Sequence, residues 1–195
     1  MRDYQKTIAL FGTSADPPTL GHQALLEGLL TLFPKVITWA SDNPKKKHIV
    51  SLNIRYSLLH TLVENIQNPH LEIKQELSSP WTISTIRKAK EKWPKSNIIF
   101  VIGSDLTEQI SGWRDVSDIF KYARIAIAPR KGWPIQKEQL ELLQSIGAEI
   151  DLLHLEIPAT ASSQIRHEFQ INNIPPSLLP RLLKENLYDL NKSKQ

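Results

Sequence analysis

Hydrophobic positions along the chain fall into short continuous runs, and amphipathic segments separate these runs. Apolar runs bounded by turn residues are typical of buried strands, and they lie at residues 7–11, 36–40, 71–74, 97–102, 124–128 and 148–157. The intervening segments predict helices at residues 23–30, after Ser51, from Trp81-Thr82 to a stop before Pro94, and at 115–122 and 135–146. Buried strands that alternate with helices predict an α/β fold, a doubly wound parallel sheet covered on both faces. We expect residues 1–195 to form one domain, with a frayed polar tail at 191–195.

The predicted sheet directs attention to one of its edges. In doubly wound sheets, ligands bind beyond the carboxyl ends of the strands. The loops expected at that edge are residues 12–22, 41–48, 79–82, 103–113, 130–132 and 158–166. Together they are rich in Lys, Arg, Ser and Thr and also contain tryptophan. This composition suits a ligand with phosphates, sugars and a flat ring.

Charge and cysteine content narrow the class of protein. The chain has a net charge of +4 and a pI near 9.2, which favour an anionic partner. Basic and aromatic residues are not interleaved as in a strand-binding platform, so we expect nucleotides rather than nucleic acid. The absence of cysteine excludes a thiol nucleophile and a thiolate metal site. Because the sequence shows no signal-peptide segment and no run of about 18 apolar residues, we expect a cytoplasmic protein with no membrane contact.

The first candidate motif is residues 12–22, Gly-Thr-Ser-Ala-Asp-Pro-Pro-Thr-Leu-Gly-His, which joins the first predicted strand to the first predicted helix. Such a junction presents backbone N–H groups and the positive end of a helix dipole, so it attracts an anion. Gly12 and Gly21 allow the backbone to approach a ligand closely. Thr19 and His22, about one helical turn apart, can direct a hydroxyl and an imidazole at the same phosphate.

The second candidate motif is residues 160–166, Thr-Ala-Ser-Ser-Gln-Ile-Arg. We predict that Ser162 or Ser163 caps the next helix and that Arg166 forks onto a phosphate near the start of that helix. A P-loop sequence and a G-x-G-x-x-G sequence are both absent from the chain. Their absence argues against P-loop enzymes and dinucleotide-binding dehydrogenases.

Both motifs resemble signatures of the nucleotidylyltransferase superfamily. The first is similar to G-x-x-x-D-P-x-[H/T]-x-G-H, with matches at Asp16, Pro17, Gly21 and His22. Thr19 replaces the first histidine, as in the pantetheine-phosphate adenylyltransferase branch. The second is similar to I-S-S-T-x-I-R, although Thr160 and Ala161 replace the leading Ile and Ser, so that one hydroxyl of the pattern is missing. The resemblance implies a Rossmann-like fold.

The middle of the chain resembles nicotinate-nucleotide adenylyltransferase through Gly103-Ser104-Asp105, Trp113-Arg114 and Arg130-Lys131-Gly132. The resemblance implies catalysis by His22, Thr19 and Arg166. It implies ATP binding by Gly12, Thr13, Ser14, Asp16, Gly21, Gly103, Asp105, Ser162 and Ser163. It implies mononucleotide binding by Lys46, Lys47, Trp81, Thr82, Trp113 and Arg130, with the choice among the lysines at 45–47 left open. The other histidines lack metal-ligand spacing, and we expect them to be structural: His48, His60, His70, His154 and His167.

Physical roles can be assigned to several of these residues. The indole of Trp113 offers a flat face for a pyridine ring, and the carboxylate of Asp105 can accept hydrogen bonds from a ribose diol. Thr82 can donate to the pyridine carboxylate, and Lys46 or Lys47 can meet the phosphate of the mononucleotide. No carboxylate cluster predicts a protein metal site, so we expect Mg²⁺ to arrive with ATP.

The predicted activity is adenylyl transfer from ATP to nicotinate mononucleotide, which gives nicotinate adenine dinucleotide and pyrophosphate. Phosphopantetheine and nicotinamide mononucleotide stay open as acceptors, the first because of Thr19. An alternative of another class is a nucleotide-binding protein or a basic nucleic-acid module without catalysis. The sequence leaves the oligomeric state open, a homo-oligomer included.

Overall fold

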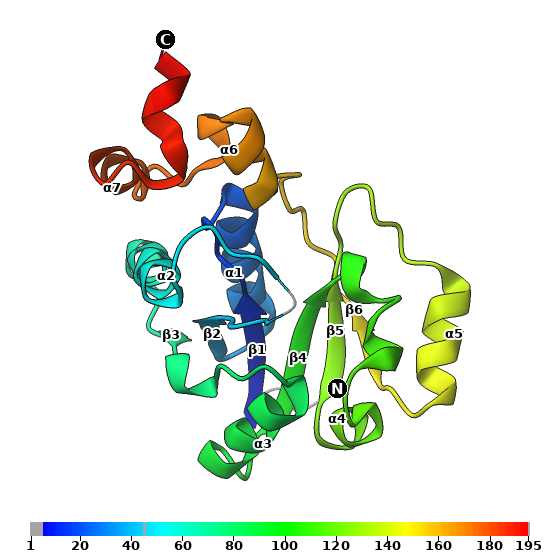
Figure 1. Ribbon diagram of the computed structural model, residues 1–195. Coiled ribbons are helices and arrows are strands. Elements are labelled where there is room, and N and C mark those ends of the chain that lie inside the picture. Colours follow the sequence, from blue (N-terminus) through cyan, green and yellow to red (C-terminus); the bar gives the residue numbers. More distant parts are fainter. Residues whose placement is uncertain (1–5, 45, 195) are drawn as a thin grey trace.

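The computed structural model describes residues 6–44 and 46–194, and its centre is a six-stranded parallel sheet (Figure 1). The strands are β1 (Thr7–Thr13), β2 (Val36–Ala40), β3 (Leu71–Ile73), β4 (Asn97–Gly103), β5 (Arg124–Ala128) and β6 (Ile150–Leu152). Their order is β3-β2-β1-β4-β5-β6, and each neighbouring pair is parallel. This order is that of a doubly wound Rossmann-like sheet, and it confirms the predicted fold class.

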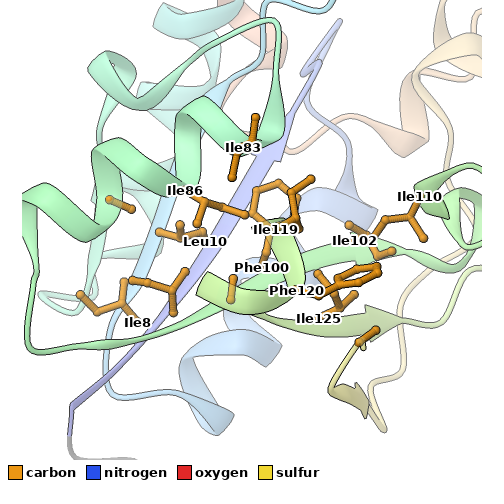
Figure 2. Close-up of a cluster of buried hydrophobic side chains, with 14 of the residues drawn as sticks. Ile8, Leu10, Ile83, Ile86, Phe100, Ile102, Ile110, Ile119, Phe120 and Ile125 are labelled. Carbon is orange, nitrogen blue, oxygen red and sulfur yellow. The ribbon is translucent and has the colours of Figure 1, made fainter. Parts of the chain in front are cut away.

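Helices cover both faces of the sheet. One face carries α1 (Leu20–Leu32) and α2 (Leu52–Ile66), and the other carries α3 (Thr82–Lys92), α4 (Val116–Tyr122) and α5 (Lys137–Ser145). Alternate residues of a strand point to opposite faces, so Ile8 and Leu10 of β1 pack with α3 and α4, whereas Ala9 and Phe11 pack with α1. Figure 2 shows the first of these clusters, where side chains of α3 and α4 meet those of the strands.

A third group of helices lies beside the carboxyl end of β1 (Figure 1). It contains α6 (Ser162–Glu168), α7 (Leu179–Lys184) and the closing 3₁₀ segment Leu187–Lys194. These elements and α2 share the C-terminal cluster, which consists of Leu58, Ile165, Ile174, Leu178, Leu182, Tyr188 and Leu190. Shorter 3₁₀ turns lie at Gln75–Leu77, Ser104–Leu106, Ile110–Gly112 and Ile171–Asn173. Residues 191–194, predicted to be a tail, continue the closing segment, and Gln195 lies outside the described residues.

Element boundaries differ most from the sequence prediction at two places, the start of α1 and the end of β6. Helix α1 begins at Leu20 because the Thr19 side chain caps it, so Gly21 and His22 lie in its first turn. Strand β6 covers only Ile150–Leu152, although the apolar pattern predicts a strand over residues 148–157. The alternating apolar residues beyond it pack instead beside α1, where Leu155 lies against Gly28. A period-two pattern therefore marks an extended segment here, not a paired strand.

Substitution of Leu26 by alanine tests the packing of α1 on the sheet. Leu26 is fully buried in the α1 face of the core, so Leu26→Ala should lower the free energy of unfolding by about 2–5 kcal/mol in denaturant titration. Leu32 on the same helix is 41% exposed, and Leu32→Ala should change it by no more than about 0.5 kcal/mol. Equal effects of the two variants would contradict this packing.

Candidate active site

A cleft of about 1280 Å³ lies over the carboxyl ends of β1 and β4. These strands are neighbours at the centre of the sheet, where the strand order changes direction. Doubly wound α/β folds bind their ligands at this switch point. The cleft is lined by every residue that the sequence analysis assigns to catalysis, ATP or the mononucleotide. The sheet topology thus brings loops from six parts of the chain to one site, as predicted.

Thr19 and His22 form a closed local unit at the start of α1. The Thr19 backbone N–H donates to Nδ1 of His22 at 3.0 Å, and the Thr19 hydroxyl lies 2.8 Å from the same nitrogen. The His22 backbone N–H in turn donates to the Thr19 hydroxyl at 3.3 Å. Because Nδ1 accepts from a backbone N–H, a neutral ring carries its proton on Nε2. Fully buried Thr19 therefore fixes the tautomer of an imidazole that lines the cleft.

The surroundings of His22 keep its imidazole neutral. Burial, together with the positive charges of Arg130 and Lys46, lowers the pKa of His22 from 6.5 to about 4. Burial disfavours the charged form of the ring, and nearby cations act in the same direction. At neutral pH, His22 is therefore a hydrogen-bond donor without a formal charge.

Hydrogen bonds join the two motifs, which lie far apart in the sequence. The Gly21 backbone N–H donates to Oγ1 of Thr160 at 2.8 Å, and the Thr160 hydroxyl donates to Oγ1 of Thr19 at 3.1 Å. A Cβ atom on Gly21 would lie 2.7 Å from that Thr160 oxygen, so glycine permits this close approach. Thr160 thus supplies a hydroxyl at the junction, although the sequence analysis counts its position only as a departure from the family pattern.

The start of α6 differs from the prediction. Its N-cap is Ala161, whose backbone N–H donates to Oε1 of Gln164 at 2.9 Å. Ser162 and Ser163, the two predicted caps, are both already helical. The Ser162 hydroxyl donates to the carbonyl of Pro17 at 2.7 Å. Arg166 reaches the same loop, where Nη1 donates to the carbonyl of Asp16 at 2.6 Å. Ser162 and Arg166 therefore hold α6 against the loop between β1 and α1.

The Asp16 carboxylate is engaged inside the protein. It is 2% exposed; Oδ1 accepts from the Tyr188 hydroxyl and Oδ2 accepts from the Ile49 backbone N–H, both at 2.9 Å. Asp16 also lines the cleft, and its role in ATP binding stays a prediction. The Asp16 carboxylate links the loop after β1 to Ile49 and Tyr188.

A buried arginine that the sequence analysis does not identify lies nearby. Arg55 of α2 is 1% exposed, and its Nη1 donates to the carbonyls of Ser14 and Ser41, both at 2.8 Å. It thereby joins the loops that follow β1 and β2. The available signal was its position three and seven residues before Leu58 and Leu62, on the apolar stripe of α2.

Aromatic side chains from different elements line the far part of the cleft. Trp113 packs edge-on against Phe100, with ring centroids 6.3 Å apart and an interplanar angle of 90°. Trp81, which is 40% exposed, carries the Arg114 guanidinium 5.1 Å above its ring, and Thr82 begins α3 beside it. These indoles give the cleft flat apolar walls.

Two residues assigned to different ligands contact each other. Arg130 Nη1 donates to Asp105 Oδ2 at 2.6 Å, an ion pair at the mouth of the cleft. The resemblance assigns Asp105 to ATP and Arg130 to the mononucleotide. The ion pair therefore lies where the predicted ATP and mononucleotide subsites meet.

The loop after β2 contributes cations to the cleft. Lys46 and Lys47 line it, whereas Lys45 lies outside the described residues. His48, expected to be structural, also lines the cleft, and its buried Nε2 has no hydrogen-bond partner within the described part of the chain. Burial and the Arg55 guanidinium lower the pKa of His48. Its place in a polar loop gave no periodicity from which this position could be inferred.

Two further findings concern only residues 6–44 and 46–194. They contain no group of three or more His, Asp or Glu residues that can hold a metal ion. Among them, no helix is both long and apolar enough to cross a membrane.

Comparison with known proteins gives the class to which this fold and cleft belong. The model of the cytidylyltransferase-like family matches residues 10–172, a span that contains both candidate motifs, residues 12–22 and 160–166. The chain belongs to this family of nucleotidyltransferases. Within it, a Synechocystis sp. protein named "Probable nicotinate-nucleotide adenylyltransferase" is 36% identical over 157 residues, 75% of this chain and 78% of that protein. The chain is therefore a member of the nicotinate-nucleotide adenylyltransferase family.

Other relatives extend the match over nearly the full length. An Aliarcobacter butzleri protein of the same name is 25% identical over 195 residues, with 96% of this chain and 98% of that protein covered. A solved structure of Plasmodium falciparum nicotinic acid mononucleotide adenylyltransferase complexed with NaAD has a TM-score of 0.76 and 23% identity. It covers 96% of this chain and 99% of its own. This solved structure therefore has the same fold as the present chain.

The state of His22 can be measured directly. Long-range ¹H–¹⁵N spectra should show the Nε2–H tautomer and an apparent pKa about 4. Unfolded chains protonate histidine near 6.5, so the free energy of unfolding should fall as pH decreases from 6.5 to 4. His22→Gln should flatten that part of the stability profile. An imidazole that titrates near 6.5 in the folded protein would contradict the described geometry.

Proposed function

We propose that the protein transfers the adenylyl group of ATP to the 5′-phosphate of nicotinate mononucleotide, forming nicotinate adenine dinucleotide and releasing pyrophosphate. The observation that carries this proposal is the hydrogen-bonded convergence of residues 12–22 and 160–166 over the centre of the sheet. Membership in the family supports it, because relatives along the whole chain bear the name of this activity.

The reaction is a displacement at the α-phosphorus of ATP. A phosphate oxygen of the mononucleotide forms a bond to that phosphorus, and the bond from it to the leaving pyrophosphate breaks. Because the attacking oxygen is already an anion at neutral pH, no general base is required. Catalysis is then positioning and electrostatic stabilisation.

The described residues fit that task. His22 donates from Nε2 without a charge, and Arg166 keeps further guanidinium N–H groups beside the one that holds Asp16. The N-terminus of α1, a helix of 13 residues, adds backbone donors and a positive dipole end. Thr19 acts through His22, since its hydroxyl and backbone N–H hold the imidazole. We therefore assign Thr19 a positioning role.

Magnesium would enter with the nucleotide. Since the described residues provide no cluster of metal ligands, Mg²⁺ would be held by phosphate oxygens and water. When bound, it supplies neutralisation of the charge on the triphosphate. The roles proposed for His22, Thr19 and Arg166 do not require any side chain to coordinate Mg²⁺.

The aromatic part of the cleft provides the acceptor subsite in this proposal. The indole of Trp113 faces a pyridine ring, Thr82 donates to its carboxylate, and Lys46 or Lys47 binds the phosphate. Arg130 and Asp105 would separate when a ribose diol takes the carboxylate. Thr19 favours phosphopantetheine as a second candidate acceptor, but the indole walls suit a flat ring better.

Removal of the His22 imidazole tests the catalytic assignment. His22→Ala should lower kcat by about 10²–10³, as the loss of a single oxyanion donor does in other enzymes. His167→Ala, on the exposed side of α6, should leave kcat unchanged. Turnover of His22→Ala close to that of the wild type at saturating ATP would refute the role.

Acceptor choice can be read from one assay. Labelled ATP is offered with nicotinate mononucleotide, nicotinamide mononucleotide or phosphopantetheine, and pyrophosphate release should be fastest with the first. Trp113→Ala should raise the KM for the pyridine mononucleotide about fivefold, the equivalent of about 1 kcal/mol of ring stacking, whereas Trp113→Phe should retain most affinity. Release no faster than background with all three acceptors would indicate a non-catalytic nucleotide-binding protein.

A further inference from the structure

We propose that Tyr188, near the end of the chain, is a positioning residue that sets the geometry of both phosphate-binding motifs through its hydrogen bond to Asp16. This inference rests on the proposed function, because its first test measures adenylyl transfer. Tyr188 itself does not line the cleft.

The contact is buried and spans the sequence. The Tyr188 hydroxyl donates to Asp16 Oδ1 at 2.9 Å across a separation of 172 residues. Both side chains are almost fully buried, at 6% and 2% exposure. Burial and the neighbouring carboxylate raise the pKa of Tyr188, so the phenol keeps its proton and donates. Loss of this donor would leave a buried carboxylate oxygen unsatisfied, which is costly in a low-dielectric site.

Asp16 connects the Tyr188 hydrogen bond to three other parts of the site. Its other carboxylate oxygen accepts from the Ile49 backbone N–H, which ends the lysine-containing loop after β2. Its carbonyl accepts from Arg166, and the chain runs from Asp16 directly to Thr19 and His22. A shift of Asp16 would therefore move a guanidinium, an imidazole and the acceptor-side loop together.

The backbone conformation around Tyr188 indicates that surrounding contacts fix its side chain in the interior of the protein. Asn186, Tyr188 and Asp189 have φ values of 46°, 60° and 55°, in the left-handed region that non-glycine residues rarely adopt. Such conformations persist where the surroundings over-determine them. Here the ring packs in the C-terminal cluster with Leu58 and with Ile165, the neighbour of Arg166.

Tyr188→Phe separates position from packing, because it keeps the ring and removes only the donor. We expect kcat to fall about tenfold, since misplacement of reacting groups by about 1 Å can cost up to 10²-fold. The KM for ATP should change less than about threefold, because remote binding contacts persist. Tyr122→Phe, an exposed tyrosine on α4, should match the wild type. A kcat within twofold of the wild type, after correction for the folded fraction, overturns the proposal.

A double-mutant cycle tests whether Tyr188 acts on the site through Asp16. It also gives a second measurement if one of the variants folds poorly. Asp16→Asn keeps the side-chain volume but cannot accept both hydrogen bonds with the same geometry. If the two residues act through one bond, adding Tyr188→Phe to Asp16→Asn should lower kcat less than twofold further. Multiplication of the two separate losses overturns the proposed route.

A measurement without turnover distinguishes this inference from the proposed function. Arg166 Nε–H and His22 imidazole resonances should shift in Tyr188→Phe and not in Tyr122→Phe, with and without ATP. Failure of all three acceptors in the assay would remove the proposed activity, yet these spectra would still report the position of the loop. Superimposable wild-type and Tyr188→Phe resonances at both residues overturn the positioning role.

Discussion

Contact between the loop after β1 and the segment that opens α6 is the constraint on which the site depends. Residues 12–22 provide the imidazole and the N-terminus of α1, and residues 160–166 provide the guanidinium, so the proposed function needs both segments. Gly21 and Thr160 set the closest approach, and Ser162 and Arg166 hold the backbone of the loop. The family fold brings these partners together because both follow strands of one parallel sheet.

Electrostatics in the cleft follow from this packing. The ring of His22 is neutral because burial and two neighbouring cations disfavour its charged form, so the positive character of the site comes from lysine, arginine and backbone dipoles. Asp105 and Arg130 partly cancel each other at the mouth. The cleft thus has hydrogen-bonded donors over the centre of the sheet and a partly exposed ion pair at its mouth.

Much of this could be predicted from local sequence. Continuous apolar runs such as residues 97–102 predicted the strands, and the glycine, proline and histidine of residues 12–22 indicated a loop that lines the cleft. The remainder depends on tertiary contacts. Leu155 alternates like a strand residue but packs on Gly28. Ser162 donates to Pro17 instead of capping α6, whose N-cap position is Ala161. The left-handed backbone at Tyr188 leaves no signal in hydrophobic periodicity.

The distribution of these contacts along the chain has a consequence during synthesis. The loop that follows β1 leaves the ribosome long before the partners that shape it, because Arg166 and Tyr188 follow Asp16 by 150 and 172 residues. A nascent chain that already contains β1 to β5 still lacks the two side chains that bind Asp16 in this loop. The loop can therefore take the described conformation only after Arg166 and Tyr188 have been synthesised, when all six strands of the sheet already exist.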